Sequence, residues 1–353
     1  MRRTRVAFAA LLLWGGFSFS HAGEPIPPAP AEVGPLLEEA VSMQEAGRHD
    51  EAIARYEEIL KVNPGLPQAL AGLAFSAYAK GDWQKTVSIA EQIVATGKDC
   101  PAGVYLVIGS AYGMMGLWDK AEEVLLLGQS VWPRDEALRF HRAINVFAQG
   151  RVSDAIDHLE RCIRNSPYRP EYWRALGDAM SADGARGRAF AAYARSLSLD
   201  GNTERSREIA QQMWRMLFEA RGTVETKPGD ATEEAEAKGL SLVGNLRHDA
   251  AWRNRSDAEY FAFALDTMLK LVSALNAEGQ RDLFWGPFAI AYFDDLRKAG
   301  HMEALAFDIR QAANDPEARA WRARNAEKLA RYRTWSERWA VNWSTVAENE
   351  TRR

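Results

Sequence analysis

The sequence predicts an all-α protein in which one helix-turn-helix unit is repeated and stacked along the chain. Three regular features indicate this class. Glycines recur at steps of 34 or 35 residues, a small side chain follows each glycine by five residues, and in most copies a large side chain follows it by nine. The glycines are Gly47, Gly81, Gly116, Gly150 and Gly184.

Each of these features has a structural reason. Glycine ends a helix in the left-handed conformation without steric cost. A small residue allows the second helix to lie close to the first, and a large residue one turn later, on the same face, fills the remaining space. The small positions are Ala52, Thr86, Ala121, Ala155 and Ala189, and the large ones are Tyr56, Ala90, Leu125, Leu159 and Tyr193, among which Ala90 departs from the pattern.

Proline marks the end of the second helix in several copies, because it cannot continue a helix. Pro64, Pro133 and Pro167 each lie seventeen residues after a glycine of the series. The second copy departs most from the others, since its proline is displaced to Pro101.

This pattern resembles the tetratricopeptide-repeat (TPR) family, whose 34-residue unit carries the motif W-x2-L-G-x2-Y…A-x3-F…P. The fifth copy matches with Trp173, Leu176, Gly177, Met180, Gly184, Ala189 and Tyr193, and the third with Tyr105, Ile108, Gly109, Tyr112, Gly116, Ala121 and Pro133. The resemblance covers about residues 33–203, roughly five repeats. It implies a right-handed TPR superhelix, followed here by an additional helical region.

The first 22 residues predict a cleaved signal peptide. Three arginines in the first five residues precede an apolar run that ends at Phe19, and Ser20-His21-Ala22 is a small-x-small cleavage pattern. An uncleaved anchor is the alternative, but the run is shorter than the roughly 20 apolar residues of a spanning helix. We therefore expect a mature chain that begins near Gly23, is exported to the periplasm or, alternatively, secreted, and has no membrane span after cleavage.

The composition after the signal peptide predicts the remaining organisation. We expect a Pro-rich spacer at 23–32, a TPR solenoid with its capping helix at 33–220, an acidic linker at 221–237, a helical C-terminal domain at 238–345 and a tail at 346–353.

The C-terminal domain is predicted to contain helices from Asp257 to about Asn276, from Met302 to Ile309, and from Asp315 to about Trp343. Gly300 is a candidate for the turn of a degenerate repeat. In the last helix one side is apolar and mainly aromatic, formed by Trp321, Leu329, Tyr332, Trp335, Trp339 and Trp343. Such a stripe is typical of a core face, here packed against the aromatic segment 284–293. The alternative is an aromatic platform for a glycan or peptide.

No catalytic motif stands out in the sequence. There is no nucleophile elbow, no phosphate-binding glycine loop, and no histidine or cysteine pair at a zinc-ligand spacing. The net charge of −4 weighs against nucleic-acid binding. Cys100 and Cys162 are separated by three helices, too far for a disulfide, and Cys162 is expected to be a small buried residue. We expect no cofactor, no metal and no enzymatic activity.

In the TPR family the first helix of each repeat lines a concave groove. The resemblance and the helical spacing therefore give the candidate partner-binding residues, which are Leu37, Val41, Phe75, Tyr78, Leu106, Met114, Phe140, Ile144 and Phe147. The fifth repeat turns polar at Arg174, Asp178 and Ser181, and the Lys, Arg and Asn set of carboxylate-clamping members is missing. We expect another segment to bury an apolar surface of this kind. That segment is either part of a partner protein or the chain's own C-terminal helices.

The sequence thus favours a periplasmic scaffold or adaptor that binds a protein or peptide segment through an apolar groove. Two alternatives stay open. One is an envelope carbohydrate- or polymer-binding protein that uses the C-terminal aromatic residues, and the other is an enzyme with an unrecognised active site in the C-terminal third.

Overall fold

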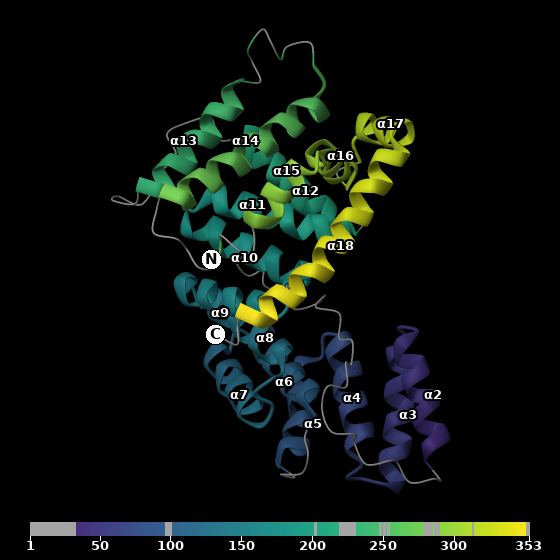
Figure 1. Ribbon diagram of the computed structural model, residues 1–353. Helices are drawn as coiled ribbons and strands as arrows, with labels where there is room; N and C mark the ends of the chain where they lie inside the picture. Colours follow the sequence, from purple (N-terminus) through teal and green to yellow (C-terminus); the bar gives the residue numbers. More distant parts are fainter. Residues whose placement is uncertain are drawn as a thin grey trace. The chain divides into compact units, whose positions relative to one another are not determined.

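A computed structural model shows an all-α chain (Figure 1). It describes residues 33–95, 101–200, 203–218, 231–246, 255–278, 290–312 and 314–350, together with Asp249, Trp252 and Trp285. In these ranges every regular element is a helix. The predicted signal peptide, the Pro-rich spacer and the last three residues of the tail lie outside them.

The chain divides into two compact units, Met1–His158 (unit 1) and Leu159–Arg353 (unit 2). Unit 1 contains α2 (Gly34–Glu45), α3 (His49–Val62), α4 (Pro67–Ala79), α5 (Trp83–Ala95), α6 (Ala102–Met114), α7 (Trp118–Val131) and α8 (Glu136–Ala148). The boundary lies inside α9 (Val152–Asn165). Unit 2 contains α10 (Pro170–Asp183), α11 (Arg186–Leu199), α12 (Glu204–Phe218), α13 (Ala231–Leu246), α14 (Asp257–Glu278), α15 (Ala291–Lys298), α16 (Met302–Ala312), α17 (Pro316–Arg324) and α18 (Ala326–Glu350).

The glycines of the series end the first helix of each repeat, as predicted. All five have left-handed backbones, with φ between 74° and 101°. At Gly47 the N–H donates to the carbonyl of Gln44 at 3.0 Å, and the next N–H, of Arg48, donates to Met43 at 2.9 Å. These bonds satisfy carbonyls that the end of a helix leaves unpaired.

Gly300 makes the same turn between α15 and α16. Its φ is 74°, its N–H donates to Arg297 at 3.0 Å, and the N–H of His301 donates to Leu296 at 3.0 Å. The turn geometry of the repeat therefore recurs in the C-terminal third, as the position of this glycine indicated.

The small and large positions of the repeat form its internal contact. None of Ala52, Thr86, Ala121, Ala155, Ala189, Tyr56, Ala90, Leu125, Leu159 and Tyr193 is more than 1% exposed. Thr86 fits the small position because its hydroxyl donates to the carbonyl of Asp82 at 2.8 Å, one turn earlier. At Gly177 the helices approach so closely that an added Cβ would lie 2.6 Å from the ring of Tyr193.

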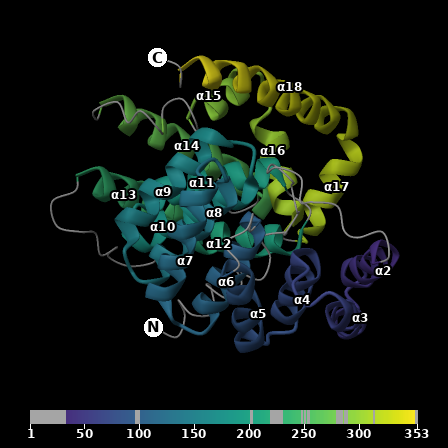
Figure 2. The ribbon, with the colours of Figure 1, turned by 90° about the horizontal axis from the view of Figure 1, so that it is seen from below.

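In unit 2 the helices gather around α11, against which α10, α12, α13, α14 and α16 all pack (Figure 2). Every residue of α11 from Ala189 to Leu197 is buried. A helix buried on all sides needs partners all round, and the C-terminal helices supply them, for example through Phe261, whose ring lies 6.5 Å from that of Phe190. The sequence placed a domain boundary at 221–237, whereas in the structure the helices on both sides of that segment share one unit.

The second half of the predicted linker is helical, because α13 begins at Ala231. Glu236 of this helix is 1% exposed and accepts hydrogen bonds from the backbone N–H groups of Gly187 at 2.9 Å and Arg188 at 3.3 Å. It also pairs with the Arg188 side chain at 3.2 Å. Ala185 precedes α11 and offers no capping side chain, so a carboxylate distant in sequence caps this helix. Burial, only partly offset by Arg188 and the two N–H groups, raises the pKa of the Glu236 carboxyl.

We expect Glu236→Ala to destabilise unit 2 by about 1–3 kcal/mol, because it leaves buried N–H groups at the start of α11 without an acceptor. Glu234→Ala is the matched control, since Glu234 lies on the same helix and its side chain is 53% exposed. Urea unfolding followed by circular dichroism measures the difference. Equal midpoints for the two variants would show that the cap contributes nothing.

The last helix of the sequence prediction is two helices in the structure. α17 ends at Arg324 and α18 begins at Ala326, with Asn325 between them at φ −122° and ψ 32°. The Asn325 side chain donates to the carbonyl of Trp321 at 2.9 Å. This bond satisfies a terminal carbonyl locally, in competition with a continued helix.

The aromatic stripe is a packing face, as the first of the two interpretations predicted. Trp321 stacks on Phe307 with ring centroids 4.5 Å apart, and the rings of Trp335 and Trp339 lie 5.7 Å and 5.0 Å from Tyr292. The Trp343 side chain lies outside the described part. Because these indoles pack against α15 and α16, the structure does not favour the glycan-platform alternative.

Candidate functional site

The nine predicted partner-binding residues lie on the first helices of four successive repeats, α2, α4, α6 and α8. Their exposure divides them into two groups. Tyr78, Leu106, Phe140 and Ile144 are 3%, 6%, 4% and 1% exposed, respectively. The other five are Leu37, Phe75, Met114 and Phe147, which are half-buried, and Val41, which is 38% exposed. We call these five residues the first-helix face.

Tyr78 and Leu106 belong to the hydrophobic core of unit 1, and Phe140 and Ile144 on α8 are buried as well, so none of the four lies on a free surface. Successive first helices pack on one another, α2 on α4, α4 on α6 and α6 on α8. Helical spacing identifies which side of each helix is apolar, but it does not show which residues the neighbouring first helix covers. Tyr78 is an example, because it is hydrogen-bonded to Ser110 of the next first helix.

Polar side chains also connect neighbouring helices inside unit 1. The Tyr56 hydroxyl donates to the Gln44 side-chain carbonyl at 3.1 Å, and Ser76 donates to the same oxygen at 3.3 Å. Further along, the Ser110 hydroxyl lies 3.1 Å from Nδ1 of His141. No sequence pattern indicates these pairs, since their members are far apart in the chain.

His141 is held in its neutral form. It is 7% exposed, and burial lowers the pKa of its imidazole from 6.5 to about 4. A neutral imidazole both donates and accepts a hydrogen bond, which suits the contact with Ser110.

The sequence did not predict the exposure of four large apolar side chains in α7 and at its start. Leu117, Leu126, Leu127 and Val131 are 43–48% exposed. α7 is the second helix of its repeat, so these residues lie apart from the first-helix face. They provide exposed apolar positions of unit 1 outside the first-helix face.

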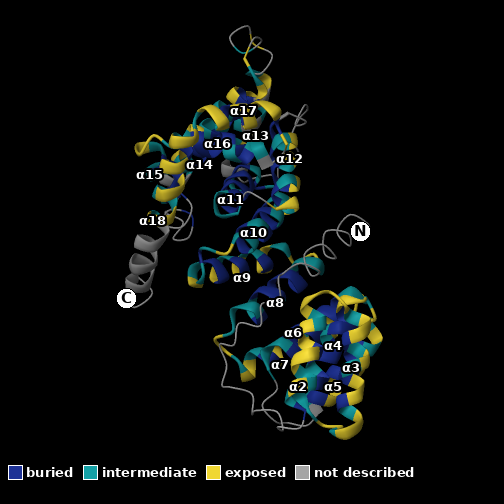
Figure 3. Ribbon diagram, turned by 90° about the vertical axis from the view of Figure 1, so that its right-hand side faces the viewer, coloured by how far each residue is buried: buried dark blue, intermediate teal, exposed yellow. Residues whose placement is uncertain are grey.

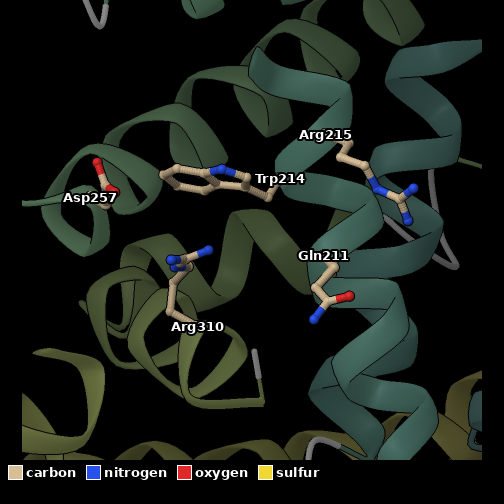
Figure 4. Close-up of a pocket in the computed structure, with 5 residues that line it drawn as sticks. All are labelled: Gln211, Trp214, Arg215, Asp257 and Arg310. Carbon is tan, nitrogen blue, oxygen red and sulfur yellow. The ribbon is translucent and has the colours of Figure 1, made fainter. Parts of the chain in front are cut away.

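A depression of about 510 Å³ lies in unit 2 (Figure 4). It is lined by Gln211, Trp214 and Arg215 of α12, Asp257 at the start of α14 and Arg310 of α16. Figure 4 shows the guanidinium of Arg310 beneath the Trp214 indole, and its Cζ lies 4.1 Å from the ring centroid.

The Arg310 side chain already has partners within the fold. Its Nη2 lies 2.6 Å from Oδ2 of Asp315, while Oδ1 of Asp315 caps α17 by accepting from the N–H of Glu317 at 2.9 Å. The other titratable lining groups are one carboxylate and one arginine, and arginine stays protonated in proteins. The depression therefore offers charge and hydrogen-bond donors rather than a general acid–base pair.

Metal-binding clusters and membrane-spanning helices are both missing from the described residues. These residues contain no group of three or more His, Cys, Asp and Glu side chains placed to bind a metal ion. None of their helices combines the length and apolarity needed to cross a membrane. Cys162 is buried, as predicted, whereas Cys100 lies outside the described residues.

Comparison with known proteins adds one family match and several structural likenesses. Residues 43–107 match the family model for the tetratricopeptide repeat. Among solved structures, MamA 41-end from Desulfovibrio magneticus RS-1 is 13% identical, with 49% of this chain and 97% of that chain covered and a TM-score of 0.43. TTC0263, a thermophilic TPR protein in Thermus thermophilus, is 24% identical, with 51% and 96% covered and a TM-score of 0.44. YrrB, a TPR protein with an unusual peptide-binding site, is 13% identical, with 51% and 91% covered and a TM-score of 0.41. No curated protein matches the chain.

The family match runs from the end of α2 to the middle of α6, and the structure extends the same unit beyond it. The left-handed glycine that ends each first helix recurs from Gly47 to Gly184. The buried small and large positions keep their spacing over the same range, through Ala189 and Tyr193. The match places residues 43–107 in the tetratricopeptide-repeat family, and the structure repeats the same helix pair as far as Tyr193.

Proposed function

We propose that this protein is an exported scaffold that holds a segment of another polypeptide on the first-helix face of unit 1. One observation carries the proposal: side chains that are apolar, and not fully buried, recur on four successive first helices. Repeats that stack in this way build extended binding surfaces from equivalent positions of neighbouring units. The proposed compartment, the periplasm, rests on the signal-peptide pattern of residues 1–22.

The composition of the face indicates the chemistry of the segment. Leu37, Val41, Phe75, Met114 and Phe147 include no charged side chain, so an apolar or amphipathic segment is the complementary ligand. Full burial of such a side chain is worth about 1.5–3 kcal/mol, and half-buried ones gain a part of that. Methionine and phenylalanine adapt well to the shape of an apolar segment.

The test changes two half-buried members of the face. We expect Phe75→Asp with Phe147→Asp to abolish capture of the partner from envelope extracts by the mature chain, because two carboxylates would have to be desolvated on binding. Phe140 is not a suitable position, since it is 4% exposed and its replacement would disturb the fold.

The matched control is Leu127→Asp with Val131→Asp, which places the same two charges on the exposed side of α7. This control should retain capture, and all proteins should keep the helicity of the wild type. Retained capture by the Phe75/Phe147 variant, or equal loss by both pairs, would reject the first-helix face as the binding surface.

A further inference from the structure

A buried arginine in unit 2 has no acidic partner among the described residues. Arg195 of α11 is 1% exposed. Its Nη1 donates to the Ser198 hydroxyl at 3.1 Å, and its buried Nε makes no hydrogen bond. The guanidinium is also hydrogen-bonded to Tyr292. Burial lowers the pKa of this guanidinium, but arginine remains protonated at neutral pH. A full positive charge is therefore held inside the protein.

Aromatic rings cover the guanidinium in place of a carboxylate. The Cζ atom of Arg195 lies 3.9 Å from the ring centroid of Tyr292 on α15 and 5.4 Å from that of Trp339 on α18. A desolvated cation–π contact stabilises the guanidinium, but by less than the free-energy cost of taking a charge out of water. The rings offset only part of the free-energy cost of burying the charged guanidinium. An anion bound to Arg195 would offset more of it.

The part of α18 that covers Arg195 is only partly buried. Tyr332 is the last buried residue of the helix in its described part. Beyond it, Trp335, Ser336 and Trp339 are half-buried, and the side chains between them are exposed (Figure 3). Hydrogen bonds tie this segment to α15 from Trp339 Nε1 to Asp295 at 3.2 Å and between the hydroxyls of Ser336 and Tyr292 at 3.3 Å. Segments with few buried apolar side chains open at low free energy.

We infer that Arg195 is a binding site for an oxyanion, a carboxylate or a phosphate group, which becomes accessible when the segment of α18 from Trp335 to Trp339 moves away. The planar guanidinium presents paired N–H donors that match both groups, and such charge-assisted bonds are about twice as strong as neutral ones. Tyr292 would stay stacked on the guanidinium, while the anion takes the side that Trp339 covers. The site is separate from the first-helix face and from the depression at Trp214, because none of its residues belongs to either.

The experiment compares anion binding by the full mature chain and its variants. Isothermal titration at low salt with inorganic phosphate, and separately with N-acetylglutamate, distinguishes the two sources of the oxyanion. We expect weak binding of at least one of them by the wild type. Trp339→Ala should bind that anion at least about tenfold more tightly, since it no longer spends free energy on opening the cover.

Arg195→Gln, added to Trp339→Ala, should remove this binding, whereas Arg338→Gln in the same background should leave it unchanged. Arg338 is an exposed arginine of α18, the helix that carries Trp339, and its replacement controls for the loss of one positive charge. Arg195→Lys should bind more weakly than arginine because it lacks the planar pair of donors, and it provides a second variant should the glutamine disturb folding. Unchanged anion affinity on removal of Trp339, or anion binding that survives both Arg195 replacements, overturns the inference.

Discussion

Ala121→Trp should destabilise unit 1 by about 3 kcal/mol or more, the largest effect that we expect from a single substitution. Ala121 occupies the small position of the third repeat, on α7, and is fully buried. α6 and α7 pack closely at this level, so an indole has no space unless the two helices separate. Thermal and urea unfolding of the variant measure the loss.

Glu123→Trp is the matched control, because Glu123 lies on the same helix and is exposed. It introduces the same side chain into solvent and should leave the midpoint within about 0.5 kcal/mol of the wild type. If Ala121→Trp and Glu123→Trp had the same unfolding midpoint, the repeat register assigned to the whole array would be wrong.

Acidification should remove about 3 kcal/mol from the stability of unit 1 through His141 alone. The folded protein holds this imidazole neutral with a pKa of about 4, against 6.5 as its ordinary value. Below pH 6.5 the unfolded state therefore binds a proton that the folded state does not, and stability falls as the pH falls from 6.5 towards 4. The shift of about 2.5 pH units corresponds to about 3 kcal/mol, at about 1.4 kcal/mol per unit.

The comparison is between the wild type and His141→Gln, which keeps a polar side chain beside Ser110 but does not titrate. Their difference in free energy of unfolding, measured in urea at pH 7 and pH 4, should change by about 3 kcal/mol in favour of the variant as the pH falls. A difference that stays constant between the two pH values would mean that His141 binds a proton as readily in the folded state as in the unfolded state.

The repeat was readable from the sequence because its signals are local. A left-handed turn requires glycine at the end of each first helix, and a close helix contact requires a small residue at a fixed distance from that glycine. Each requirement restricts the type of residue at a fixed position of the repeat, as at Gly47 and Ala52. Gly300 was recognisable for the same reason, although the rest of its repeat is degenerate.

The features that escaped prediction depend on contacts between distant segments. Glu236 lies in a stretch whose composition is typical of a linker, and only the docking of α13 on α11 shows that it is a cap. The same docking joins the helices on both sides of the predicted linker at 221–237 in one unit, Leu159–Arg353. Similarly, Tyr78 and Phe75 are both apolar positions of α4, yet Tyr78 is buried and hydrogen-bonded to Ser110 of α6, whereas Phe75 is half-buried.

The candidate site was predicted at the level of helices rather than of side chains. All nine residues lie on first helices, yet four of them are interior residues, and the exposed apolar side chains of α7 were not expected. Arg195 also carried no sequence signal, because a buried arginine and a surface arginine in a helix look alike until the covering rings of Tyr292 and Trp339 are seen.

The most direct test of the central claim is site-specific photo-crosslinking in cells that produce the full chain. A photoreactive phenylalanine analogue at position 75 samples the first-helix face, and the same analogue at position 127 samples the exposed side of α7. We predict that position 75 yields a crosslink to a polypeptide other than this chain, identified by mass spectrometry, and that position 127 does not yield that product. Crosslinks to the partner at position 127 but not at position 75, or crosslinks from position 75 only to the chain itself, would contradict the account.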